Sequence, residues 1–335
     1  MRDRIEVITE CADLERLQPE WDALYERSPP ATPFQQPSWL IGWWHCFSPG
    51  SLHVICVRRA GKLIGCAPFY AETTAAGRPR MLPLGIGVSD YLDVLIAPEA
   101  FVEVDRLLGD HIAARRDELG SWELCELRPE SAAMSLSVPT GMIEQRAECS
   151  TCPVLAIPSG ASDLKQVLPA HRLQALRTGW RRARAFGNLR IEQASIESAR
   201  ESLAVLDELH RKRWRSEGAP GVTADRRVHD LLMRSVPDWI ASGRCILLVM
   251  FCDQIPVAAH LLLRGRKELL SYMTGYDPEF SRLGAGALLL GDAIERARRT
   301  GEQFHFLRGE ERYKYLWGAR PRSNWRRLFT SREPQ

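Results

Sequence analysis

The chain has 335 residues, 45% of them apolar and 26% charged, with a formal net charge of +3 at pH 7. This composition excludes a wholly disordered chain and fits one large domain or two ordinary ones. A charge so near neutral does not by itself indicate nucleic-acid binding. No run of 18 apolar residues occurs and the first residues lack an apolar signal segment, so we expect no membrane span and a cytoplasmic protein.

Nine cysteines are present, an odd number at irregular spacings, and most lie in apolar runs. Buried free thiols explain this usage better than a disulfide framework. Cys149 and Cys152 form one Cys-x-x-Cys pair, but no second pair of ligands follows at a similar spacing. We therefore expect no metal site.

In the first half, apolar residues at three- and four-residue steps, such as Leu14, Leu17 and Trp21, predict a helix, and a turn at 60–62 predicts a strand hairpin. The predicted elements, in chain order, are helices over 10–27 and 37–47, strands over 52–59 and 63–70, a strand-like segment over 81–96, a helix over 99–118 and a strand over 122–127. A segment rich in Pro, Ser, Ala and Gly over 128–162 is interpreted as a linker.

The second half shows a similar order of elements. They are helices over 163–186 and 196–216, strands over 244–252, 255–264 and 268–276, a helix over 284–300, a strand over 303–307 and a short helix over 310–317. In both halves a hairpin is followed by another strand, a long helix and a final strand, which indicates an internal duplication. The prediction is a mixed α/β fold of two pseudo-repeated halves, 1–150 and 151–335.

The most specific local signal is a glycine turn between a strand and a helix. The strand over 268–276 is followed by Leu283-Gly284-Ala285-Gly286, which opens the helix over 284–300. Free backbone N–H groups and the helix dipole at such a turn favour a pyrophosphate, with Arg282 as an added charge. The alternative is a tight turn whose glycines serve packing. Neither a P-loop nor a Rossmann fingerprint is present.

The run over 275–286, followed by the run over 304–319, resembles the CelD-like branch of the GNAT acyltransferases. The runs over 33–39 and 89–93 agree with that branch. The resemblance implies a tandem GNAT fold that binds acetyl-CoA or another acyl-CoA and transfers the acyl group by direct attack of an amine of a small molecule or sugar precursor, or of a sugar hydroxyl in a close variant. Ser281 stands where the family usually has Gln or Arg, which puts a side-chain contact there in doubt.

On this resemblance the second half holds the cofactor. The expected cofactor-binding residues are Met273, Thr274, Arg282, Leu283, Gly284, Ala285, Gly286, Tyr313 and Lys314. In the first half the corresponding turn over 97–100 has no glycine and contains Pro98 and Glu99, which disfavour phosphate. The first half is therefore expected to shape the acceptor pocket.

Several residues are candidates for proton transfer. His260 is the first candidate base, because its ordinary pKa suits the task and it interrupts an apolar strand; the alternative is a hydrogen-bonded core histidine. Asp277 and Glu310 could bind or deprotonate an amine, or serve as a turn residue and a helix N-terminal charge. Tyr315 or Tyr313 could protonate the leaving thiolate.

Two carboxylates around an aromatic residue, Asp90, Tyr91 and Asp93, suggest a site for the acceptor amine, although a turn beside a strand edge explains them equally well. Trp214 and Arg308 complete the predicted substrate-binding set.

Arginines gather in one stretch, at Arg172, Arg177, Arg181, Arg182, Arg184 and Arg190. The related FemX-type transferases use a tRNA-borne substrate, so this stretch is a possible RNA contact, whereas a solvated helix face is the usual explanation. Three functions stay open: an acyl-CoA-dependent N-acyltransferase, an aminoacyl-tRNA-dependent transferase, and a non-catalytic module of an exopolysaccharide or envelope pathway. The sequence leaves the oligomeric state open.

Overall fold

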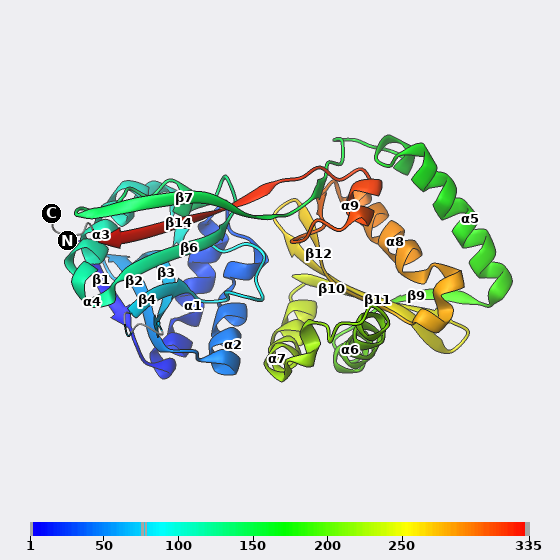
Figure 1. Ribbon diagram of the computed structural model, residues 1–335, viewed down its shortest axis with the longest axis horizontal. Helices are drawn as coiled ribbons and strands as arrows, with labels where there is room; N and C mark the ends of the chain where they lie inside the picture. Colours follow the sequence, from blue (N-terminus) through cyan, green and yellow to red (C-terminus); the bar gives the residue numbers. More distant parts are fainter. Residues whose placement is uncertain (1–2, 75–76, 78, 332–335) are drawn as a thin grey trace. The chain divides into compact units, whose positions relative to one another are not determined.

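The computed structural model describes residues 3–74, 77 and 79–331, and the chain divides into two compact units (Figure 1). The first unit comprises Met1–Ser150 together with Ser323–Gln335, and the second comprises Thr151–Arg322. Each unit is built on its own β-sheet. The predicted mixed α/β fold is therefore confirmed. The C-terminal segment differs from the prediction, because Ser323–Gln335 lies with the first unit and not with the second. Residues 1 and 2, part of the N-terminal segment examined for a signal, lie outside the described residues.

The first unit has a sheet in the order β1-β2-β3-β4-β6-β14-β7, with β5 on β3. Its elements are β1 (Arg4–Ile8), α1 (Cys11–Arg27), α2 (Pro37–Phe47), β2 (Ser51–Arg59), β3 (Lys62–Thr73), β4 (Pro79–Pro83), β5 (Leu95–Ile96), α3 (Phe101–Ala114), α4 (Arg116–Leu119), β6 (Ser121–Leu127), β7 (Met142–Thr151) and β14 (Ser323–Ser331). Large aromatic side chains fill its core, among them Trp21, Trp39, Trp43 and Trp122.

The second unit has a sheet in the order β8-β13-β12-β11-β10-β9. Its elements are β8 (Val154–Leu155), α5 (Ala170–Phe186), β9 (Leu189–Gln193), α6 (Ala199–Ser216), α7 (Arg226–Ala241), β10 (Cys245–Cys252), β11 (Ile255–Gly265), β12 (Glu268–Tyr276), α8 (Ala285–Thr300), β13 (Gln303–His305) and α9 (Arg312–Leu316). Helices α5 and α8 cover one face of this sheet, and α6 and α7 cover the other (Figure 1).

The strand connections repeat between the units. β1, β2, β3 and β4 pair antiparallel in succession, and so do β9, β10, β11 and β12. In each unit a helix then leads to a strand that pairs in parallel, β6 with β4 and β13 with β12. The predicted internal repeat is therefore present in the topology.

The predicted linker over 128–162 is wrong in part, because it contains β7 and β8. β7 shows little hydrophobic alternation, since most of its side chains are exposed. The edge strands β1 and β9, the strand β14 and the helix α7 were not predicted either. In the described part of the chain, no helix is long and apolar enough to cross a membrane.

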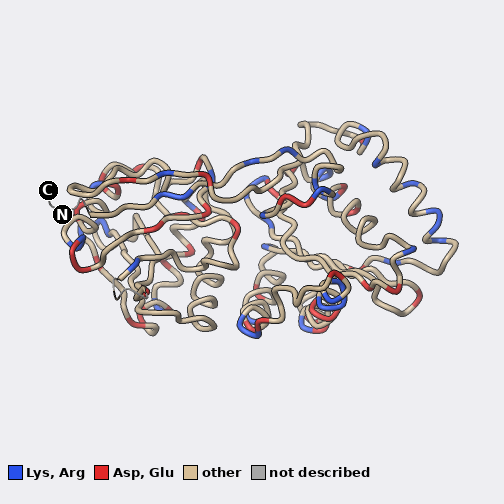
Figure 2. Tube along the Cα trace, viewed as in Figure 1, with Lys and Arg blue, Asp and Glu red and all other residues tan. Residues whose placement is uncertain are grey.

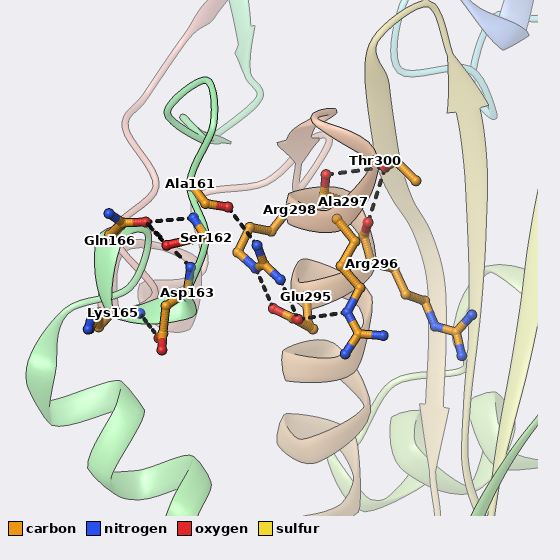
Figure 3. Close-up of polar contacts among 11 residues, drawn as sticks. Ala161, Ser162, Asp163, Lys165, Gln166, Glu295, Arg296, Ala297, Arg298 and Thr300 are labelled. Atoms are coloured by element: carbon orange, nitrogen blue, oxygen red, sulfur yellow. Dashed lines mark hydrogen bonds and ion pairs between the residues drawn. The ribbon is translucent and has the colours of Figure 1, made fainter.

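The segment that leads into α5 is fastened to the far end of α8 (Figure 3). Arg298 donates to the carbonyl oxygen of Ala161 at 2.6 Å and pairs with Glu295 through both ends of its guanidinium. Asp163 and Gln166 form a capping box in the same segment. These contacts fix the start of α5 beside α8, the helix that carries the glycine turn.

Candidate active site in the second unit

A cavity of about 440 Å³ opens where β12 separates from β13. The parallel pairing of these strands covers only Glu268, Leu270 and the residue between them, so the edge of β12 from Ser271 to Tyr276 has no strand partner on that side among the described strands. On its other side β12 stays paired with β11, with an irregularity at Leu261/Leu262. The separation leaves a polar backbone edge along one wall of the cavity.

The start of α8 forms the next wall. Its N-cap, Gly284, has the left-handed backbone conformation (φ 65°) and offers no capping side chain. The amides of Ala287 and Leu288 donate hydrogen bonds to the carbonyl oxygen of Gly284 at 3.0 and 3.1 Å. Ala285 and Gly286 lie before them and line the cavity. A helix start without a side-chain cap presents amide donors and partial positive charge to an anion here.

The structure brings some predicted cofactor residues to this cavity and not others. Thr274, Gly284, Ala285, Gly286 and Tyr313 line it. Leu283 is buried in the hydrophobic core of the unit, and Met273 lies in a small space against α6 and α7. Arg282 is exposed and does not line the cavity.

Lys314 was expected to bind the cofactor, but it does not line the cavity. Its side chain is 3% exposed. The ammonium donates to the carbonyl oxygens of Leu307, Arg308 and Gly309 at 3.2, 2.8 and 3.1 Å and pairs with Glu311 at 2.9 Å. All of its hydrogen-bonding capacity goes to the loop after β13, so Lys314 supports that loop.

His260 lies in the cavity wall and is 1% exposed. Its Nε2 lies 2.8 Å from the hydroxyl of Ser271, and its Nδ1 has no hydrogen-bond partner among the described residues. Burial lowers the pKa of His260 to about 3. The imidazole is therefore neutral at physiological pH and a weak base, and this geometry agrees with the alternative of a core histidine.

Asp277 is buried at the cavity edge. One carboxylate oxygen accepts from the amide of Glu279 at 3.0 Å, and the other accepts from Lys212 at 2.8 Å. Asp277 thus caps the short 3-10 helix Pro278–Leu283, which precedes Gly284. Its carboxylate is committed to positioning the glycine turn.

The candidate proton-transfer residues on α9 and just before it differ in whether they line the cavity. Tyr313 lines the cavity and contacts the edge of Phe306. Desolvation, with a smaller contribution from Glu311, raises the pKa of Tyr313 to about 12, so its hydroxyl holds its proton. Tyr315 and Glu310 do not line the cavity. Desolvation, followed by the charge of the neighbouring Glu310, raises the pKa of Tyr315.

A polar group from α6 also enters the cavity, and we did not predict it. Arg213 donates to the hydroxyl of Thr274 at 2.8 Å and to Glu217 at 3.1 Å. Its guanidinium lies over the rings of Trp214 and Tyr276, 5.2 and 5.6 Å from their centroids. Trp214 therefore flanks Arg213 and does not itself line the cavity. The only sequence signal was a carboxylate four residues after an arginine, which is common on solvated helices.

Arg172, from the basic stretch, reaches the cavity from α5. It donates to the carbonyl oxygen of Leu316 at 3.2 Å and lies 5.5 Å from the ring centroid of Trp317. Arg308, predicted to bind substrate, contributes its carbonyl oxygen to Lys314 and does not line the cavity.

The predicted acceptor residues of the first unit are buried there. Asp93 accepts from the amides of Val94, Ala132 and Ala133 at 2.8, 2.9 and 2.8 Å. Burial raises the pKa of Asp93 to about 7, opposed by these three amides. Tyr91 is 1% exposed, and the carbonyl oxygen of Asp90 accepts from Asn324. None of the three lines the cavity of the second unit. They lie neither at an exposed strand edge nor in an open amine site.

A larger cavity of about 580 Å³ lies at the other end of α8. Its lining includes Arg296 and Arg299, which are paired with Asp292 and Glu295. The C-terminal end of a helix carries partial negative charge and disfavours an anionic ligand. We therefore place the candidate site at the smaller cavity, beside the N-terminal end.

Residues 170–315 match the family model described as an acetyltransferase (GNAT) domain. These residues include α5, every cavity-lining residue except Trp317, and α9 up to its last residue but one. The second unit therefore has the fold of a GNAT acetyltransferase domain. No curated protein matches the chain by sequence.

Solved structures share the architecture over nearly the whole chain. A conserved protein of unknown function from Bacteroides thetaiotaomicron has 13% identity and a TM-score of 0.62, over 98% of this chain and 100% of that one. FemX has 10% identity and a TM-score of 0.62, over 97% of both chains. L-PGS from Bacillus licheniformis has 12% identity and a TM-score of 0.59, over 94% of this chain and 91% of that one. At such identities the likeness extends to the fold alone.

Proposed function

We propose that the protein is an acyl-CoA-dependent N-acyltransferase that uses the cavity beside α8. The observation that carries this proposal is the meeting, in one cavity, of a helix start without a side-chain cap at Gly284 and the part of β12 from Thr274 to Tyr276, which pairs with no described strand on that side. The first offers amides to a pyrophosphate, and the second offers amides to an acyl carbonyl.

The residues present fit an acyl-CoA. The space into which a Cβ of Gly284 would point is open for 4 Å, and Ala285 and Gly286 bring no side chain large enough to obstruct an approaching phosphate. Acyl-CoA would supply the activated thioester. The edge of β12 near Thr274 would orient its carbonyl, and Arg213 fixes the hydroxyl of Thr274.

Proton transfer is assigned to two side chains. Glu217 is the carboxylate of the cavity that is not committed to a backbone cap, and we propose that it accepts the proton of the acceptor amine, in place of His260, Asp277 and Glu310. Tyr313 holds its proton at neutral pH and is proposed to donate it to the leaving sulfur, in place of Tyr315.

The finer assignments rest on the sequence resemblance. They are membership of the CelD-like branch, transfer of an acetyl group to an amine of a small molecule or sugar precursor, and a place in cytoplasmic polysaccharide synthesis. Residues Asp90, Tyr91 and Asp93 are no longer proposed as acceptor ligands, since all three are buried in the first unit.

The test is thiol release from acetyl-CoA in the presence of a panel of amines, with wild type, Glu217→Gln and Glu208→Gln. Glu208 lies on α6, the helix that ends just before Glu217; it pairs with Lys212 and is outside the cavity. We expect Glu217→Gln to reduce kcat by about a hundredfold, as removal of a general base does, and Glu208→Gln to leave it unchanged. Equal activity of all three proteins would refute the role of Glu217, and no release with any amine would refute the proposed reaction.

A second candidate function, aminoacyl-tRNA-dependent transfer, is favoured by α5. No acidic residue occurs between Asp163 and Glu192, and Figure 2 shows basic residues without acidic ones along α5. Arg177, Arg181 and Arg182 are exposed and form no ion pair with the described residues. Unneutralised arginines of this kind attract a phosphate backbone.

The two functions are distinguished by tRNA binding at several salt concentrations. We compare the double variant Arg181→Gln/Arg182→Gln with Arg226→Gln/Arg234→Gln, which removes two exposed arginines from α7. tRNA-dependent transfer predicts that only the α5 variant loses affinity and lowers the salt slope by about two. Absent or equal binding would leave acyl-CoA-dependent transfer alone.

A further inference from the structure

Three side chains that are typical metal ligands meet in the first unit, away from the candidate active site. They are Cys11, Glu15 and His45, and their ligand atoms all lie within 4.8 Å of one another. The Cys11 sulfur is 3.9 Å from Nδ1 of His45 and 4.0 Å from a carboxylate oxygen of Glu15. Nε2 of His45 is 2.9 Å from that same oxygen.

We propose that these three residues bind one divalent transition-metal ion of the Zn²⁺ class. A thiolate, an imidazole and a carboxylate are the ligand types that zinc takes, at about 2.3, 2.0 and 2.1 Å. Tetrahedral coordination at those lengths places ligand atoms about 3.3–3.6 Å apart. The sulfur distances need to shorten by about half an ångström. His45 faces Cys11 through Nδ1 and Glu15 through Nε2, and only one nitrogen can bind the ion, so the Glu15 carboxylate or the imidazole also has to turn. The Glu15 side chain is 53% exposed and free to make that adjustment.

The local structure explains why these residues meet. Cys11 is the first residue of α1, and Glu15 follows four residues later, on the same face. His45 lies in the last turn of α2. Helices α1 and α2 pack together, and the contacts of His45 with Cys11 and Glu15 place the beginning of α1 beside the end of α2. The ligands therefore come from two elements that the core already holds in place.

The end of α2 carries partial negative charge, which attracts a cation beside His45. Desolvation and the charge of Glu15 raise the pKa of the Cys11 thiol, so the ion has to displace that proton. On binding, the thiol proton of Cys11 leaves to solvent and the ion takes its place. The group comprises three ligands among the described residues, so water would complete a four-coordinate shell.

The ion would join α1 and α2, which already pack against each other and share the His45–Glu15 pair. We expect it to raise the Tm of the first unit, because an ion that binds the folded state only stabilises that state. The site needs neither acyl-CoA nor an acceptor, so it stands independently of the proposed function.

The experiment is a titration of the reduced, untagged full chain with Co²⁺, followed by displacement with Zn²⁺. The variants are Cys11→Ser, His45→Gln and, as the matched control, Cys149→Ser, which removes an exposed thiol elsewhere. We expect a sulfur-to-cobalt charge-transfer band that saturates at one equivalent, disappears in Cys11→Ser, persists in Cys149→Ser and is displaced by Zn²⁺. His45→Gln should weaken binding at least tenfold while it leaves every thiol in place.

The proposal is overturned if wild type gives no such band, or if the band is the same in Cys11→Ser. Circular dichroism checks the fold of each variant. If Cys11→Ser fails to fold, the decision passes to His45→Gln and Glu15→Gln, and unchanged affinity in both would overturn the site.

Discussion

Tyr313 and Tyr315 stand two positions apart on α9 and have different surroundings. Tyr313 reaches the cavity of the second unit, where it contacts Phe306, whereas Tyr315 lies beside Glu310 outside the cavity. A helix turns by about 100° per residue, so residues two apart cannot share a face. A proton donor for the reaction must therefore be one of them and not both.

We predict that Tyr313→Phe lowers kcat by about a hundredfold with little change in KM, because it removes a proton donor and keeps the ring. Tyr315→Phe should stay within about twofold of wild type. Steady-state thiol release measures both. A larger loss in Tyr315→Phe than in Tyr313→Phe would contradict the assignment.

At the residue scale, a feature formed by adjacent residues could be predicted. The meeting of residues that lie far apart in the sequence could not. Gly284 and Gly286 could be found because the turn they form is defined by adjacent residues. Arg213 and Glu217 could not, because their place in the cavity depends on how α6 packs against β12, about 60 residues later. Lys314 was misassigned because nothing in its neighbourhood shows that three carbonyl oxygens surround its ammonium.

Two glycines of the second unit differ in how much room a Cβ would have there. Gly275, on β12, faces α6: a Cβ there would lie 2.4 Å from the backbone nitrogen of His210 and 2.6 Å from the carbonyl carbon of Leu209. Gly286, in the first turn of α8, has room, since its Cβ would meet Tyr276 at 3.4 Å. The first glycine is required by packing, and the second is not.

We predict that Gly275→Ala destabilises the second unit by about 3 kcal/mol, because backbone cannot yield as a side chain can. Gly286→Ala should be neutral or stabilising by up to about 1 kcal/mol, since alanine favours a helix. Urea unfolding measures both changes.

The same Gly286→Ala variant should bind acetyl-CoA more weakly, because its methyl group narrows the approach to the helix start. Undiminished affinity would mean that Gly286 serves neither packing nor the cofactor. A large loss of stability in Gly286→Ala would instead contradict the packing described here.

Most helices with an apolar face were predicted well, although α7 was missed despite its buried face, and edge strands were not predicted. α1, α2 and α8 carry periodic buried residues and were found within a few residues of their bounds. β7 has one buried residue and β9 has none, so their pairing partners define them and hydrophobic alternation does not.

The whole molecule holds several histidines that are neutral in the fold. In the first unit, Nε2 of His53 lies 3.1 Å from Nε2 of His111, whose Nδ1 faces Arg115 at 3.1 Å. Burial, followed by the charge of Arg115, lowers the pKa of both, that of His111 to about 4. His260 is the counterpart in the second unit.

The sign of the pH dependence follows from these lowered values. An unfolded histidine titrates near 6.5, so below that pH the unfolded chain binds protons that the folded chain does not bind. This contribution to stability is complete above pH 6.5 and is lost as the pH falls toward about 4. Asp93, whose pKa is raised, makes a contribution to stability that depends on pH in the opposite sense. It is present in wild type and in the variants compared below, so its contribution is the same in all of them.

We predict that His111→Gln shows a smaller decrease of Tm between pH 7 and pH 5 than wild type does, by about 2–4 °C. His171→Gln, at an exposed position on α5, should follow wild type. Thermal unfolding followed by circular dichroism checks this. A variant profile parallel to wild type would show that His111 is protonated in the fold.

At the scale of the chain, the duplication was predictable because both halves keep the same order of elements. The return of β14 to the first sheet was not, because it pairs with β6 nearly 200 residues earlier and no local pattern encodes that partner. The crossing also places the last strand of the chain in the unit that lacks the glycine turn.

The most direct test of the account compares acetyl-CoA binding by calorimetry in wild type, Gly284→Glu and Gly301→Glu. Gly284 caps the beginning of α8 and Gly301 caps its end. Both have the left-handed conformation, with φ of 65° and 71°, and both have open space around a Cβ. The two variants carry the same charge and similar backbone strain, of about 1 kcal/mol. We predict that Gly301→Glu binds as wild type does and that Gly284→Glu does not bind. Equal binding by all three proteins would contradict a cofactor site at the start of α8, and so would no binding by any of them.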